Sequence, residues 1–136
     1  MIKVLTVGVF DLLHYGHVKL FERAKDLGEY LIVAVQTDEN VKIYKPNAEI
    51  IYNTKQRTEM VSSIKYVDKV INYETVDNIV KKVEYDILVI GEDQKHEGFQ
   101  AAIQYSENMN KKVIVLHRTR DVSSSELKNK IERVFW

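Results

Sequence analysis

The chain has 136 residues, and 20 basic and 20 acidic side chains give it a formal net charge of zero. This balance excludes an overall attraction to nucleic acid or to an anionic membrane, so any anion site has to be local. The absence of cysteine excludes disulfides, thiolate metal sites and thiol catalysis. The length predicts a single domain over residues 1–136. Because no apolar run approaches the ~20 residues of a membrane span, we expect a cytoplasmic protein.

Five short apolar runs rich in valine and isoleucine predict strands that are buried on both faces, as in parallel sheets. These runs are Val4–Val9, Tyr30–Val35, Lys69–Tyr73, Ile87–Ile90 and Val113–Leu116. Amphipathic segments between and after them predict helices, several of which begin at a capping residue. These are Val18–Leu27 ended by Gly28, a helix opened by an Asn53–Gln56 capping box and carrying Met60, Val61 and Ile64, a helix capped by Thr75, one from about Phe99 to Met109, and a last one from Ser123 with Glu126 three residues on. The alternation predicts an α/β protein with a doubly wound, five-stranded parallel sheet.

The segment Val41–Tyr52 is the longest one without clear periodicity, and it contains Pro46, the single proline of the chain. We interpret it as a mobile loop over the site. Its basic residues Lys42 and Lys45, taken alone, are more typical of a solvated surface than of a ligand site.

The stretch Val7–His17 passes from an apolar strand through a short polar turn into a helix. A helix start offers backbone N–H groups without intrahelical partners, at the positive end of the helix dipole. His14 and His17 add donors, and positive charge when they are protonated, while Gly16 lets a ligand approach the backbone. The stretch therefore predicts a site for the phosphates of a nucleotide.

A zinc site is the alternative use of the two histidines. It would need a third protein ligand, for which only His96, His117 or carboxylates remain. Phosphate binding is favoured because it also explains the glycine and the helix start.

Further polar stretches follow other predicted strands, at the edge where open α/β sheets bind their ligands. They are Thr37-Asp38, Gly91-Glu92-Asp93, and Arg118-Thr119-Arg120-Asp121 leading into Ser123-Ser124-Ser125. Solubility alone does not account for this convergence.

Three motifs resemble those of a known family. Gly8-Val9-Phe10-Asp11 followed by His14-Tyr15-Gly16-His17 resembles the HxGH signature of the nucleotidyltransferase superfamily. Lys65-Tyr66-Val67-Asp68 resembles an Arg-Tyr-Val-Asp stretch, and Arg118–Ser125 resembles an Arg-Thr-x-x-Ile-Ser-Thr-Thr motif. Together they resemble the cytidylyltransferases, most closely those that use glycerol 3-phosphate, over nearly the whole chain. The resemblance implies a Rossmann-like nucleotidyltransferase fold.

The resemblance also implies a reaction. A phosphate oxygen of a small phosphorylated alcohol attacks the α-phosphorus of CTP, giving a CDP-linked product and pyrophosphate. Positioning and electrostatic stabilisation can supply most of the acceleration, and no covalent enzyme intermediate is expected. The family further implies Mg²⁺ bridging the phosphates and a homodimer, and the product would feed the synthesis of a cell-surface polysaccharide.

Site residues are assigned by the same resemblance. Catalytic roles fall on His14, His17, Lys45 and Arg118. Nucleotide binding falls on Gly8, Val9, Phe10, Gly16, Asp93, Thr119 and Ser123. Binding of the second substrate falls on Asp11, Arg57 and Lys65.

Several residues depart from the family pattern. Val9 replaces a threonine, Lys65 replaces an arginine, and Arg120-Asp121 replaces Glu-Gly, while the stretch 94–100 differs throughout. These departures leave open another phosphorylated acceptor and ATP as the nucleotide. A nucleotide-binding sensor without turnover is the alternative outside enzymes, and the complete His14, His17, Arg118 and Ser123 set argues against it.

Overall fold

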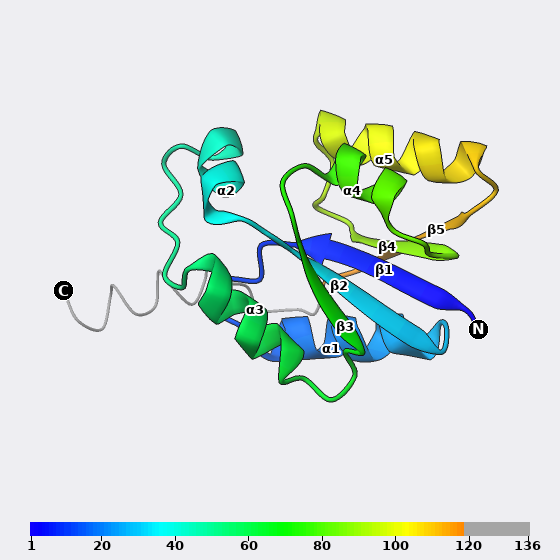
Figure 1. Cartoon of the computed structure of the whole chain (residues 1–136), viewed down its shortest axis with the longest axis horizontal. Helices are drawn as coiled ribbons and strands as arrows, with labels where there is room; N and C mark the ends of the chain where they lie inside the picture. Colours follow the sequence, from blue (N-terminus) through cyan, green and yellow to red (C-terminus); the bar gives the residue numbers. More distant parts are fainter. Residues whose placement is uncertain (119–136) are drawn as a thin grey trace.

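The computed structural model describes residues 1–118, which fold as strands alternating with helices around one sheet (Figure 1). The elements are β1 (Lys3–Gly8), α1 (Tyr15–Asp26), β2 (Tyr30–Gln36), α2 (Asp38–Tyr44), α3 (Thr54–Ser62), β3 (Lys69–Tyr73), α4 (Val76–Lys82), β4 (Ile87–Gly91), α5 (Glu97–Asn108) and β5 (Lys112–Leu116). The helix predicted from Ser123 lies outside the described residues. None of the helices within residues 1–118 has the length and apolar character that a membrane span requires.

The sheet is parallel throughout, in the order β3-β2-β1-β4-β5. The chain winds from β1 outward to β3 and then returns to place β4 on the other side of β1. Figure 1 shows α1 and α3 on one face of the sheet and α4 and α5 on the other. The predicted doubly wound sheet is therefore confirmed, and each strand ends within one residue of its predicted bounds. The winding direction reverses between β1 and β4, which places a crevice at their carboxyl ends.

Both faces of the sheet are covered by core, which explains the continuous apolar runs of the sequence. On one face Leu5 packs with residues that include Tyr73 and Phe99. On the other face Val4 belongs to a cluster with Phe21 of α1. Each fully buried apolar side chain contributes roughly 1.5–3 kcal/mol relative to exposure.

The helices differ from the prediction mainly at their starts. Helix α1 begins at Tyr15 rather than at Val18, because His14 caps it. The Asn53–Gln56 capping box of α3 is confirmed in both directions, although the helix ends before Ile64. Thr75 precedes α4 as predicted, but its side chain makes no capping hydrogen bond.

The loop predicted over Val41–Tyr52 is partly wrong. Helix α2 occupies Asp38–Tyr44, and Val41 is buried beneath it. A helix of seven residues is too short to show a convincing period in sequence. Irregular chain follows it from Lys45 to the start of α3.

Candidate active site

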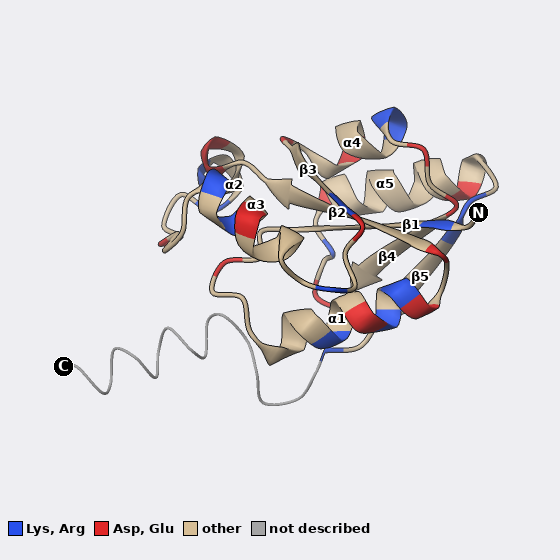
Figure 2. Cartoon of the chain, turned by 60° about the horizontal axis from the view of Figure 1, so that its bottom comes forward, with Lys and Arg blue, Asp and Glu red and all other residues tan. Residues whose placement is uncertain are grey.

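A cavity of about 840 Å³ opens at the carboxyl ends of β1 and β4, where the winding reverses. It is lined by the turn between β1 and α1, by the segment around Lys45, by residues after β4 and by Arg118 after β5. Figure 2 shows acidic and basic residues interspersed along α1, as the zero net charge leads us to expect. Attraction for an anion therefore comes from the groups inside the cavity.

The turn between β1 and α1 is tightly wound. Phe10 and Leu12 both have the left-handed backbone conformation, with φ of 56° and 49°, which is uncommon for residues other than glycine. The Phe10 ring folds back over Gly8, where an added Cβ would lie 2.8 Å from the ring. Gly8 is thus required for this fold of the turn. Phe10 also packs edge-on against His17 and Phe21, so the strained turn is held by core contacts.

His14 and His17 form a reciprocal cap at the start of α1. The Nδ1 of His14 accepts a hydrogen bond from the Gly16 amide at 3.0 Å, and the Nδ1 of His17 accepts from the His14 amide at 3.2 Å. An Nδ1 that accepts an N–H cannot itself carry hydrogen, so each neutral ring is protonated on Nε2. The rings stack with centroids 3.9 Å apart, and both line the cavity. The cap therefore fixes both the tautomer and the ring orientation.

The helix cap also defines which groups at this site are donors. The amide of Gly16, a residue assigned to nucleotide binding, donates to the Nδ1 of His14. Burial of the ring, followed by the charge of His14, lowers the pKa of His17 to about 3, although the Asp11 carboxylate opposes the shift. His17 is therefore a neutral N–H donor near pH 7, not a cation.

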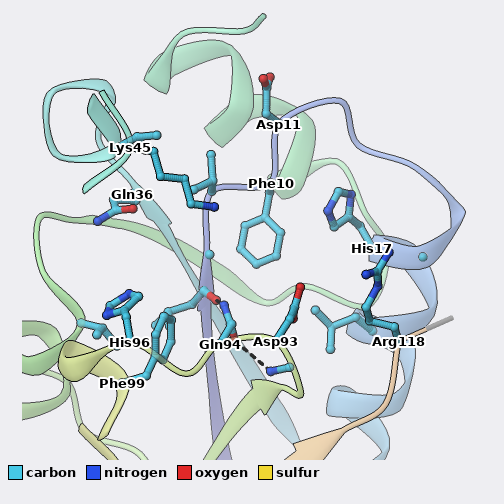
Figure 3. A pocket seen from close by; sticks show the side chains of 18 of the residues that line it. Phe10, Asp11, His17, Gln36, Lys45, Asp93, Gln94, His96, Phe99 and Arg118 are labelled. Carbon is cyan, nitrogen blue, oxygen red and sulfur yellow. Dashed lines mark hydrogen bonds between the residues drawn. The ribbon is translucent and has the colours of Figure 1, made fainter. Parts of the chain in front are cut away.

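Asp11 holds down the segment that carries Lys45. Its carboxylate is buried and accepts hydrogen bonds from the Ile51 amide at 2.8 Å and the Tyr52 amide at 3.0 Å. Lys45 is the C-cap of α2 at the other end of this segment, and its exposed side chain lines the cavity. Figure 3 shows Lys45 extending over the cavity near Phe10. Asp11 also lines the cavity, so its predicted place beside the substrates is compatible with its structural role.

Arg57 does not line the cavity, and its predicted contact with the second substrate is wrong. Its side chain is 0% exposed and donates to three carbonyls, to the Asp38 carboxylate and to the Thr54 hydroxyl. Two of the carbonyls belong to Val9 and Gln36, at the carboxyl ends of β1 and β2. Arg57 therefore supports the turn between β1 and α1 through the Val9 carbonyl.

Asp38 pairs with the buried Arg57 guanidinium and is itself 32% exposed. Burial acts to raise the pKa of Asp38, but hydrogen bonds from Arg57 and Thr54 outweigh it and hold the pKa below its ordinary value. The carboxylate stays ionised, as the fully buried guanidinium requires.

Lys65 also lies away from the cavity. It follows α3 in the turn before β3, at the amino end of that strand, and its ammonium lies 5.1 Å from the centre of the Tyr66 ring. The cavity is at the carboxyl ends of the strands. Within one chain, the predicted contact of Lys65 with substrate is therefore wrong.

Arg118 lines the cavity beside the α1 helix start. Glu92 after β4 accepts from its amide at 3.1 Å and contacts His117 at 2.9 Å. Arg23 of α1 donates to the His117 carbonyl at 3.0 Å, which ties this segment to α1. Figure 3 shows Arg118 on the same side of the cavity as His17. Gly8, Val9, Phe10, Gly16 and Asp93 also line the cavity, whereas Thr119 and Ser123 lie outside the described residues.

Gln94 and His96 line the cavity, although the sequence prediction did not assign either of them to the nucleotide site. Gln94 accepts from the Gly91 amide at 2.8 Å and donates to the Val7 carbonyl at 2.9 Å, so it joins β4 to β1 at the crevice. His96 caps α5 by accepting from the Gly98 amide at 3.1 Å, and it lines the cavity. The pattern His-x-Gly, present in both His14-Tyr15-Gly16 and His96-Glu97-Gly98, was the available signal for His96.

A zinc site has no support in the part of the chain that the structure describes. There, no three His, Asp or Glu side chains come together as metal ligands. The Nδ1 atoms of His14 and His17 are both engaged in the helix cap.

A parallel sheet with a histidine-lined cavity at its reversal point is typical of a nucleotide-binding α/β domain. The chain belongs to the cytidylyltransferase-like family, whose sequence profile matches residues 5–130. Members of this family are nucleotidyltransferases, and this chain is one of them.

Several relatives of the chain are named glycerol-3-phosphate cytidylyltransferase. The chain is 38% identical to the glycerol-3-phosphate cytidylyltransferase of Staphylococcus aureus, over 96% of each chain. It is 40% identical to the enzyme of that name from Bacillus spizizenii, over 94% of this chain and 95% of the relative. Among solved structures, a lipopolysaccharide core biosynthesis protein from Thermoplasma volcanium superposes with a TM-score of 0.70 at 30% identity, covering 88% of this chain and 97% of that one.

Proposed function

We propose that the protein transfers CMP from CTP to glycerol 3-phosphate and releases pyrophosphate. The observation that carries this proposal is the neutral, cap-oriented imidazole of His17 in a cavity that also holds Lys45 and Arg118. Full-length relatives named for this reaction support the choice of CTP and of the acceptor.

In this reaction the protein has mainly to position the two substrates and to stabilise negative charge. An oxygen of the acceptor phosphate bonds to the α-phosphorus of CTP, and the bond from that phosphorus to the bridging oxygen of pyrophosphate breaks. The acceptor oxygen is already ionised, so no strong base is needed. Negative charge grows on the phosphoryl oxygens and the leaving group, and an N–H donor fixed in advance stabilises it without reorganisation. His17 supplies such a donor.

The cations have a complementary role. Lys45 is held between the end of α2 and the Asp11 anchor, and Arg118 approaches from the opposite wall of the cavity. One positive charge on each side can hold the two phosphate-bearing substrates against their mutual repulsion. Neither group has to gain or lose a proton.

Mg²⁺ is part of the proposal. The donor set fits an ion that arrives with the triphosphate, because Mg²⁺ keeps most of its ligands as water and phosphate oxygens. Asp93, whose exposed carboxylate lines the cavity, and Asp11 are the acidic groups that would face it. When bound, the ion would neutralise charge on the phosphates.

We further propose that the enzyme works in the cytoplasm as a homodimer, and that its product is an activated precursor for a cell-surface polysaccharide. The family resemblance supports the dimer. The Thermoplasma volcanium protein, described as a lipopolysaccharide core biosynthesis protein, supports this class of pathway. Light scattering at micromolar concentration tests the dimer directly.

Pyrophosphate release tests the reaction. The protein is incubated with Mg²⁺, with CTP or ATP, and with glycerol 3-phosphate or other phosphorylated acceptors, and the product is identified by phosphorus NMR. We expect CDP-glycerol from CTP and glycerol 3-phosphate. Faster turnover with ATP or with another acceptor would redirect the assignment, and CTP binding without turnover of any acceptor would support a sensor.

A further inference from the structure

The start of α5 presents a third oriented imidazole to the cavity. The Nδ1 of His96 accepts from the Gly98 amide at 3.1 Å, so the neutral ring carries its hydrogen on Nε2. Within residues 1–118, no protein group hydrogen-bonds that Nε2. The backbone of Gly98 lies directly beneath the ring, since a Cβ there would be 3.0 Å from the His96 Cε1. The ring position therefore depends on a glycine two residues later.

Two aromatic side chains hold this ring from other sides. The Tyr44 ring at the end of α2 stacks on it with centroids 5.4 Å apart and 16° between the planes. The buried Phe99 ring meets it edge-on at 4.6 Å. Tyr44 directly precedes Lys45, so the stack also links the ammonium-bearing segment to α5.

His96 lies at the end of the cavity opposite the α1 helix start. Figure 3 shows His96, Gln36 and Phe99 on one side, His17 and Arg118 on the other, and Lys45 between them. The amide nitrogen of Gln36 donates to the Glu74 carbonyl at 2.9 Å, so it is used within the protein. The His96 Nε2–H is then a hydrogen-bond donor fixed in position at this end.

We propose that His96 determines specificity by donating this hydrogen bond to a hydroxyl of the acceptor. The inference rests on the proposed function, which places the triphosphate at His17 and Arg118 and the acceptor phosphate within reach of Lys45. The rest of the acceptor then extends toward His96. This end of the cavity would select short phosphate monoesters that carry a hydroxyl on the chain over those that lack one, because only a hydroxyl can accept from the oriented Nε2–H.

The test compares glycerol 3-phosphate with propyl phosphate, which has the same carbon chain without hydroxyls. The variant is His96→Asn, because asparagine also caps helices and its side-chain oxygen can accept from Gly98 while its amide is too short to replace the ring. Tyr44→Phe is the matched control, because it keeps the stacked ring and the Lys45 segment and leaves His96 unchanged.

In the wild type and in Tyr44→Phe we expect kcat/KM to favour glycerol 3-phosphate. In His96→Asn this preference should fall about tenfold, with the KM for CTP unchanged. An unchanged preference, or an equal loss for both acceptors, would overturn the specificity role. Absence of any product from the wild type with CTP and glycerol 3-phosphate would instead overturn the proposed function, so the two failures are distinguishable.

Discussion

The helices α1 and α5 begin in the same way on opposite sides of one cavity. They differ at the residue three positions after the capping histidine. Each is capped by a histidine whose Nδ1 accepts from the amide of a glycine two residues later. The next residue is His17 in α1 and Phe99 in α5. In α1 the capping ring stacks on a second imidazole with centroids 3.9 Å apart, whereas in α5 it meets a phenyl edge at 4.6 Å.

The two helix starts therefore share the orientation of the capping ring and differ in the number of imidazoles that they present to the cavity. Both helix starts orient a capping imidazole through the same backbone contact, but only α1 adds a second ring that is partly buried and held neutral. Arg57 stabilises the turn that leads into α1 by donating to the Val9 carbonyl. We infer that α1 serves bond making and breaking, and that α5 serves recognition of the acceptor.

Removing the second imidazole should give the largest effect. In His17→Gln the new side chain keeps an acceptor for the His14 amide, as in a normal capping box, but loses the fixed Nε2–H. We expect kcat to fall by about 10²–10³, the usual loss for one preorganised donor, with little change in thermal stability. A steady-state pyrophosphate assay measures the rate. Turnover within threefold of the wild type would refute the role given to His17.

The support under α1's turn is tested by Arg57→Lys. A lysine ammonium cannot reach all the acceptors that the planar guanidinium serves, which leaves buried carbonyls and Asp38 without partners. We expect a loss of about 3 kcal/mol in the free energy of unfolding, measured in urea. The exposed Lys65→Ala provides the control and should change it by less than ~0.5 kcal/mol. Equal stability of the two variants would contradict the account.

The anchor of the Lys45 segment is tested by a graded pair of substitutions. Asp11→Asn removes one of the two oxygens that accept from Ile51 and Tyr52, and Asp11→Ala removes both. Each lost acceptor should cost about 1–2 kcal/mol in unfolding free energy, and kcat/KM should fall in the same order. If Asn and Ala gave identical kinetics, the loop-holding role would be wrong.

The neutral state of His17 predicts a pH dependence of stability. Its folded pKa of about 3 lies below the ordinary 6.5, so between these values only the unfolded chain takes up the proton. The free energy of unfolding is therefore unaffected by the titration of this histidine above pH 6.5. It decreases as pH falls toward 3, by at most about 1.4 kcal/mol per pH unit. Urea unfolding of the wild type minus His17→Gln isolates this slope from the carboxylates. A difference that stays constant from pH 7 to 4 would contradict the low pKa.

The hydrophobic pattern and the residues that end each element predicted the sheet well. Strands that are buried on both faces appear in the sequence as uninterrupted apolar runs such as Tyr30–Val35. The same logic placed His14 and His17 at a helix start. It missed α2 because its seven residues bury little besides Val41.

Side-chain direction was beyond the reach of the sequence. The family resemblance assigned Arg57 to the second substrate, but only the fold shows that its guanidinium points inward to the carbonyls at the strand ends. The sequence left the charge of the two imidazoles open, because the burial that keeps His17 neutral depends on Phe10 folding back over the turn. From the sequence, His96 was considered only as a possible zinc ligand, and its place in the cavity was missed because its partner Tyr44 is 52 residues away in sequence.

The most direct test of the central claim observes the imidazole nitrogens themselves. The four histidines of the uniformly ¹⁵N-labelled protein are assigned by single substitutions, and long-range proton–nitrogen correlation spectra are recorded at pH 7 with and without CTP. We predict that His17 is neutral with its hydrogen on Nε2, and that CTP shifts this nitrogen more than the corresponding one of His96. A protonated His17, a hydrogen on its Nδ1, or a His17 signal that CTP leaves unmoved would contradict the account.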